Sequence, residues 1–92
     1  MSPAAAAAVP RIHPKARLAW DDVRGRDVLL YPEGLVALNA TGAEILKLCD
    51  GVRPLGEIVA TLERRFGTTG LEPEVGAFLG GLAGKGLVLY GP

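Results

Sequence analysis

Ser2, His13 and Cys49 are the single serine, histidine and cysteine of this sequence, and these three residue types often act as nucleophiles or general bases in enzymes. An active site needs an activated nucleophile, an acid–base pair or a metal. No motif joins these three residues, and Cys49 has no C-x-x-C partner that would form a redox or zinc site. No glycine-rich phosphate loop follows a predicted strand. The sequence therefore predicts a protein that is not an enzyme and that binds neither a metal nor a cofactor.

The charges of the chain balance, with 10 basic and 10 acidic residues among 92. Nucleic-acid-binding proteins usually carry a basic excess, because neutralising phosphates supplies much of their affinity. The apolar runs are far shorter than the roughly 18–20 residues that a membrane span requires. The single cysteine cannot form an internal disulfide. We therefore expect a cytoplasmic protein that binds neither nucleic acid nor membrane.

The chain is organised around the segment Leu29–Gly51, which has the pattern of strand, turn, strand and helix. Pro32 and Gly34 are typical of a tight turn between two strands. Thr41 is the expected N-cap of the helix, and Glu44 follows at the spacing of a capping box. This pattern predicts a β-hairpin followed directly by a helix.

A further strand is expected before this segment, because Arg17–Asp21 alternates between polar and apolar residues. In this strand Trp20 is the expected core anchor. The three strands together predict an antiparallel meander whose third strand lies at an edge. Both faces of the second and third strands are apolar, so helices of the same chain, a second subunit or a ligand must cover the second face.

Two more helices are expected after the hairpin. Leu55–Phe66 places apolar residues on one stripe at helical spacing. The last helix begins near Glu72 and contains four glycines, each of which costs about 1 kcal/mol relative to alanine. Residues 1–10 are expected to be a disordered tail, and residues 11–92 a single domain. The predicted fold class is α+β: a winged-helix-like, three-stranded antiparallel β-meander followed by three α-helices.

The residues from Trp20 to Gly51, WDDVRGRDVLLYPEGLVALNATGAEILKLCDG, are similar to the PqqD family, whose members act in the biosynthesis of pyrroloquinoline quinone (PQQ). The most specific part is V-L-L-Y-P-E-G, then L-N-x-T, then I-L-x-L-C-D-G. A weaker match extends the resemblance to about residues 11–89. The alanine-rich start and the glycine-rich last helix depart from the family pattern.

This resemblance implies a RiPP recognition element, a domain that binds the precursor of a ribosomally synthesised and modified peptide. The implied partners are the precursor peptide PqqA and the radical-SAM enzyme PqqE, which cross-links a Glu and a Tyr of PqqA. The peptide is expected to add as a strand to the third strand of the meander and to lie against the last helix. The residues implied for this site are Leu35, Val36, Ala37 and Leu38 on the strand with Val75, Phe78, Leu79 and Leu82 on the helix.

Two other functions remain open at this point. A winged-helix protein that binds DNA or RNA is the alternative, although the last helix lacks the several basic or amide residues of a recognition helix. The doubly apolar sheet also fits a structural protein that forms a homodimer.

Overall fold

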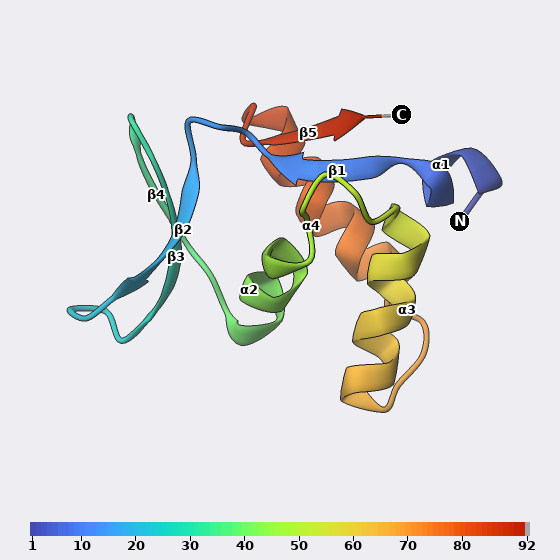
Figure 1. Ribbon diagram of the computed structural model, residues 1–92. Helices are drawn as coiled ribbons and strands as arrows, with labels where there is room; N and C mark the ends of the chain where they lie inside the picture. Colours follow the sequence, from blue (N-terminus) through green and yellow to red (C-terminus); the bar gives the residue numbers. More distant parts are fainter. Residues whose placement is uncertain (92) are drawn as a thin grey trace.

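The computed structural model describes residues 1–91 and combines helices with two antiparallel sheets (Figure 1). In chain order the elements are α1 (Pro3–Ala7), β1 (Val9–Ile12), β2 (Arg17–Asp21), β3 (Arg26–Tyr31), β4 (Gly34–Ala37), α2 (Ala40–Lys47), α3 (Leu55–Phe66), α4 (Glu72–Gly84) and β5 (Val88–Gly91). The predicted α+β class is confirmed. The structure differs from the predicted order of three strands and three helices, because α1 and β1 precede the meander and β5 follows the last helix.

The three-stranded sheet has the order β2-β3-β4, so β4 lies at an edge as predicted. Leu29 of β3 lies opposite Leu18 of β2 and Val36 of β4, and all three side chains therefore share one face of the sheet. These residues pack with the hydrophobic core, in which Leu29 is completely buried. The helices of the chain thus cover one face of the meander.

The N-terminal residues 1–10, expected to be a disordered tail, contain helix α1 and the start of strand β1. Ser2 caps α1 through its Oγ, which accepts a hydrogen bond from the Ala5 N–H at 3.2 Å. β1 pairs with β5 in a second, two-stranded sheet, and the Ala8 carbonyl accepts a hydrogen bond from the Leu55 N–H at 2.7 Å. The amino group of Met1 forms an ion pair with Glu72 at 2.9 Å. The partners of β1, Ala8 and Met1 lie far along the chain, so the local composition of the segment gave no sign of them.

The predicted capping box of α2 is wrong. The N-cap is Asn39, whose Oδ1 accepts a hydrogen bond from the Gly42 N–H at 2.7 Å. The helix begins at Ala40, so Thr41 already lies inside its first turn. The Glu44 carboxylate forms ion pairs with Lys47 and Arg65 instead of reaching back to the backbone. Asn and Thr are both good N-caps, and the two-residue difference in where the helix starts decided between them.

Replacing the cap should therefore reduce stability at only one of these two positions. Asn39→Ala is expected to lower the free energy of unfolding by about 1 kcal/mol, because the Gly42 N–H loses its acceptor. Thr41→Ala is the matched control and should change the free energy by less than about 0.5 kcal/mol. Urea titrations followed by circular dichroism measure both values. An equal loss of free energy of unfolding in the two variants would show that Thr41 also contributes to capping the helix.

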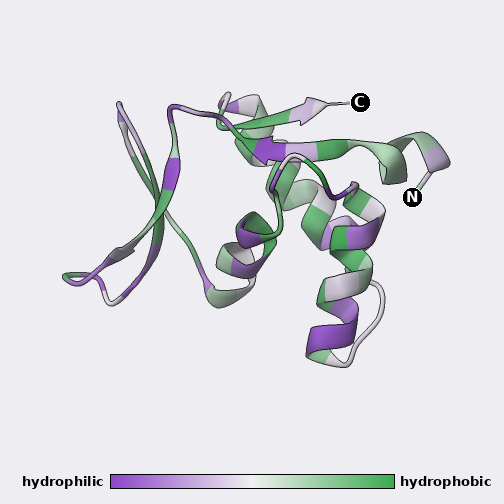
Figure 2. Ribbon diagram, viewed as in Figure 1, coloured by the Kyte–Doolittle hydropathy of each residue, from purple (hydrophilic) through white to green (hydrophobic). Residues whose placement is uncertain are grey.

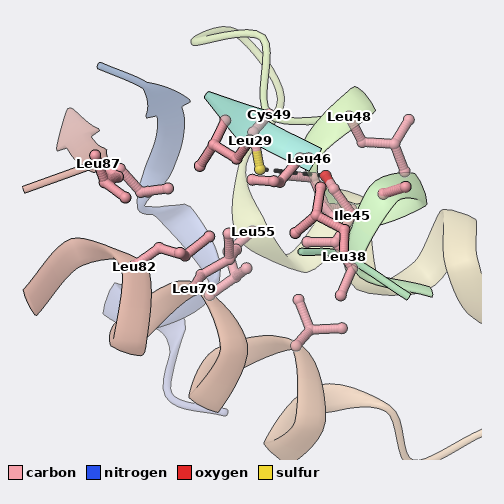
Figure 3. Packing of buried hydrophobic residues seen from close by; sticks show 14 of the residues in the cluster. Leu29, Leu38, Ile45, Leu46, Leu48, Cys49, Leu55, Leu79, Leu82 and Leu87 are labelled. Atoms are coloured by element: carbon pink, nitrogen blue, oxygen red, sulfur yellow. Dashed lines mark hydrogen bonds between the residues drawn. The ribbon is translucent and has the colours of Figure 1, made fainter. Parts of the chain in front are cut away.

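The core lies between the meander, α2, α3 and α4 (Figure 3). α3 has alternating hydrophobic and hydrophilic bands along its length (Figure 2) and buries the side that its spacing predicted, except that Phe66, the last residue of the predicted stripe, is 47% exposed. Leu55 of α3 faces Leu79 and Leu82 of α4 in the close view of the core (Figure 3). The buried residues of these two helices are Leu55, Ile58, Val59, Leu62, Val75, Leu79 and Leu82.

Trp20 is not the core anchor that the alternating pattern predicted, because 60% of its surface is exposed. It shares a sheet face with Leu18, which does pack against the core. Trp20 lies near the far end of β2, where the β2–β3 hairpin extends beyond the helices (Figure 1). The period of a strand identifies the face on which a residue lies, but not whether a helix reaches that part of the face.

The glycines of α4 occupy open positions. A Cβ atom built on Gly76, Gly80, Gly81 or Gly84 would meet nothing within 4 Å. The fold therefore does not require glycine at these positions for space, and the residues lower the helix propensity of α4 without a packing reason.

Gly80→Ala is accordingly expected to raise the free energy of unfolding by about 0.5–1 kcal/mol and to slow amide exchange in α4. Gly67→Ala is the matched control with the opposite sign, because Gly67 ends α3 with a left-handed φ of 62°. Chemical denaturation and amide hydrogen exchange measure the two effects. Destabilisation by Gly80→Ala would show that another requirement holds this glycine in place.

Candidate functional site

One edge of the meander presents unpaired backbone groups. The N–H of Leu38 donates a hydrogen bond to the Asp27 carbonyl at 3.0 Å. Antiparallel ladders alternate, so the N–H groups of Val36 and Gly34 also point toward β3. Leu35 and Ala37 then direct one N–H and one C=O each away from the sheet. Because β4 pairs only with β3 in residues 1–91, these four groups can pair with an added strand.

The end of this edge is fixed by a side chain of the neighbouring strand. Nε of Arg26 donates a hydrogen bond to the Leu38 carbonyl at 3.0 Å. Asn39 then caps α2. β4 is therefore anchored where it enters the helix, and the backbone groups of Leu35 and Ala37 are held in a regular strand.

Of the four α4 residues that the sequence assigned to the site, only Phe78 is partly exposed. Its ring lies at the start of α2, where a Cβ added to Gly42 would be 3.1 Å from two ring carbons and 3.1 Å from Oδ1 of Asn39. The structure thus brings Phe78 to the residues that directly follow β4.

The other predicted site residues divide into two groups. Leu35 and Val36 are half-buried and Ala37 is exposed, so all three lie at the accessible edge. Leu38, Val75, Leu79 and Leu82 are at most 4% exposed and belong to the hydrophobic core. The structure therefore places these four residues behind the site, where they support it without a surface that a peptide can reach.

Two residues at the site were not identified from the sequence. Asn39 could have been found, because asparagine is among the best N-cap residues and precedes the helix by one position. Arg26 could not, because its bond to Leu38 spans 12 residues and depends on the register of two strands.

The candidate nucleophiles are not assembled into a catalytic group. Cys49 is buried, and its Sγ donates a hydrogen bond to the Ile45 carbonyl at 3.3 Å (Figure 3). Burial, and secondarily the charge of Asp50, raises the pKa of this thiol to about 12, so it stays protonated at neutral pH. Nδ1 of His13 accepts a hydrogen bond from the Lys15 N–H at 3.0 Å, and Ser2 caps α1.

Residues 1–91 contain no group of three or more His, Cys, Asp or Glu side chains arranged to hold a metal ion. None of their helices has the length and the apolar character needed to cross a bilayer.

Comparison with known proteins places the chain in a family. The sequence profile of Coenzyme PQQ synthesis protein D (PqqD) matches residues 27–88, which include the meander edge and all three larger helices. The chain belongs to the PqqD family. The match begins at Asp27 and ends in β5, so it contains the most specific part of the sequence resemblance, from Val28 to Gly51, but not residues 20–26.

Individual PqqD relatives agree with this assignment. A PqqA binding protein of Methylococcus capsulatus is 47% identical over 64 residues, which cover 70% of this chain and 69% of the relative. A PqqA binding protein of Pseudomonas aeruginosa is 43% identical over 72 residues and covers 77% of this chain and 78% of the relative.

A solved structure supports the same fold. The solution NMR structure of the PqqD part of Methylobacterium extorquens PqqCD superimposes with a TM-score of 0.76 at 32% sequence identity, over 88% of each chain. That protein is described as a functional, stand-alone RiPP recognition element. The PqqD assignment therefore agrees in sequence and in three-dimensional structure.

Proposed function

We propose that this chain binds the precursor peptide PqqA by adding it as a strand to β4. The observation that carries the proposal is the unpaired edge of β4, where Leu35 and Ala37 direct four backbone groups outward. Strand addition uses such groups for affinity and alternate side-chain pockets for specificity. Membership in the PqqD family and relatives that are PqqA binding proteins support PqqA as the peptide.

In this proposal Phe78 contributes to specificity by contacting side chains of the bound peptide. An added strand points alternate side chains toward the helices and away from them. Those on the helix side lie toward Phe78, which is partly exposed beside the start of α2. Leu35, Val36 and Ala37 form the strand side of the site, and Leu38, Val75, Leu79 and Leu82 hold it in place from the core.

The chain then acts as a peptide chaperone and not as an enzyme. It presents PqqA to the radical-SAM enzyme PqqE, which performs the chemistry, while β2 to α4 serve as a winged-helix-like scaffold. Backbone pairing at one edge leaves the far side of the peptide free for a second protein. The buried, protonated thiol of Cys49 agrees with a role in binding rather than catalysis.

Titration of the purified protein with PqqA, followed by calorimetry and amide exchange, tests the proposal. Saturable binding is expected, and the amides of Leu35 and Ala37 should become protected in the complex. The amide of Val36 is the internal control, because it already pairs with β3. Binding without any new protection at Leu35 and Ala37 would place PqqA elsewhere on the protein.

If the protein forms a homodimer, the edge of β4 is the surface through which the two copies would pair. Two copies that pair through β4 would compete with PqqA, because both use the N–H groups of Leu35 and Ala37. Light scattering with and without PqqA detects this competition.

A further inference from the structure

The face of the meander that points away from the helices is largely apolar. Register places on it the side chains of Arg17, Ala19, Asp21, Arg26, Val28, Leu30, Leu35 and Ala37, which we call the outer face. The apolar members other than Val28 do not belong to the hydrophobic core of residues 1–91. α2 packs on the opposite side of the sheet (Figure 1). Only Val28, at the centre of the outer face, is fully buried there.

A pocket of about 290 Å³ adjoins this face at the end near the β3–β4 turn. Its lining residues are Pro14, Lys15, Ala16, Arg17, Leu30, Tyr31 and Pro32. This volume is close to the lower limit of ordinary ligand pockets, so it accommodates a side chain of another protein better than a cofactor. The pocket combines an apolar wall with two cationic side chains.

The cationic side chains that line the pocket are Lys15 and Arg17, and the exposed Glu33 follows the lining residue Pro32. Neither Lys15 nor Arg17 forms an ion pair with another residue in the range 1–91. The acidic residue of the outer face, Asp21, is already paired with Arg24 at 2.6 Å.

We propose that the pocket and the adjoining β2 and β3 part of the outer face form a second docking surface, which binds a segment of a partner protein with carboxylates beside an apolar side chain. The carboxylates lie at Lys15 and Arg17, and the apolar side chain packs on Leu30. This inference rests on the proposed function: the partner is the enzyme that modifies the peptide bound at β4. Clustered cations around an apolar centre favour such a partner through electrostatic complementarity.

The position of the pocket allows both partners to bind at once. β4 and β2 are the two opposite edges of the meander. The peptide site uses the β4 edge, whereas Lys15 and Arg17 precede or belong to β2. The two sites are therefore separable by mutation.

The test measures the affinity of PqqE for the protein loaded with PqqA. Lys15→Glu/Arg17→Glu reverses both charges, and Lys15→Gln/Arg17→Gln removes them while keeping the aliphatic stems. Arg64→Glu is the matched control, because Arg64 is an exposed cation on α3, away from the pocket. We expect the reversed pair to weaken PqqE binding by at least about tenfold, with a smaller loss for the neutral pair. PqqA affinity should stay within about threefold of the parent in all variants.

Each other result has a defined meaning. PqqE affinity unchanged in the folded, PqqA-binding variants overturns the inference and leaves the proposed function intact. An equal loss in Arg64→Glu also overturns it, because the effect is then general charge attraction. Loss of PqqA affinity in the folded variants would make the pocket part of the peptide site. If the parent protein binds no PqqA, the proposed function fails and this inference fails with it.

Discussion

Val36→Pro should unfold the domain or nearly so, whereas Ala37→Pro should leave it folded and weaken peptide binding. The two residues are neighbours on β4, but the register gives their N–H groups opposite directions. The N–H of Val36 points to Leu29 of β3, and its side chain packs against the core. Proline at this position removes a ladder hydrogen bond and displaces the central strand pairing, at an expected cost of about 3 kcal/mol or more. The total free energy of unfolding of such a domain is roughly 5–15 kcal/mol, so this loss removes a large part of it.

Ala37 lies at the exposed edge, where proline is tolerated because the missing N–H faces solvent. The fold should therefore survive. The peptide loses one backbone hydrogen bond and meets the proline ring, so binding should weaken by about 1–2 kcal/mol, or roughly five- to thirtyfold. Thermal unfolding measures the first variant, and calorimetric titration with PqqA measures the second.

Ala37→Ser is the matched control, because it keeps the N–H and nearly the same volume. Its peptide affinity should equal that of the parent within about twofold. If Ala37→Pro is folded and binds PqqA as tightly as Ala37→Ser does, strand addition at β4 is excluded.

Leu79→Ala and Phe78→Ala should also separate stability from binding, at adjacent positions of α4. Leu79 is completely buried among residues of α3 and α4 (Figure 3). Its truncation is expected to lower the free energy of unfolding by about 2–5 kcal/mol, because it removes packing and leaves a cavity. Phe78 is partly exposed at the start of α2, so its truncation should cost less stability and more PqqA affinity.

Urea titration and PqqA titration of the same two proteins provide the comparison. The decisive quantity is the affinity of each variant under conditions where it is fully folded. Folded Leu79→Ala should bind PqqA almost as the parent does, since its side chain has no surface for the peptide. A larger loss of affinity for Leu79→Ala than for Phe78→Ala would mean that the peptide opens the core when it binds.

The sequence by itself determined the elements whose signals are local. Alternation with period two located β2, apolar runs on either side of a turn located β3 and β4, and the stripe from Leu55 to Phe66 located α3. The turn residues between β3 and β4 placed the hairpin, and the residues from Trp20 to Gly51 indicated the PqqD family that the comparisons bear out. Each of these signals is carried by residues that lie close together in the sequence.

The same local signals located the candidate edge but could not select its residues. Leu35, Val36 and Ala37 were placed correctly at the rim of the sheet, because an edge strand follows from the order of the strands. The sequence could not tell which of their N–H groups point outward, since this depends on the hydrogen bond between Leu38 and Asp27. It also could not separate Phe78 from its buried neighbours, because all of them are apolar.

Only the tertiary structure decided what depends on contacts between distant residues. The pairing of β1 with β5 gives the N-terminal segment a partner about 80 residues away. Trp20 is exposed because the helices do not reach its end of β2, and Leu38, Val75, Leu79 and Leu82 are buried because α3 and α4 pack together. The physical reason is common to all of these features: a side chain's own periodicity sets its direction, but its burial depends on which other element covers it.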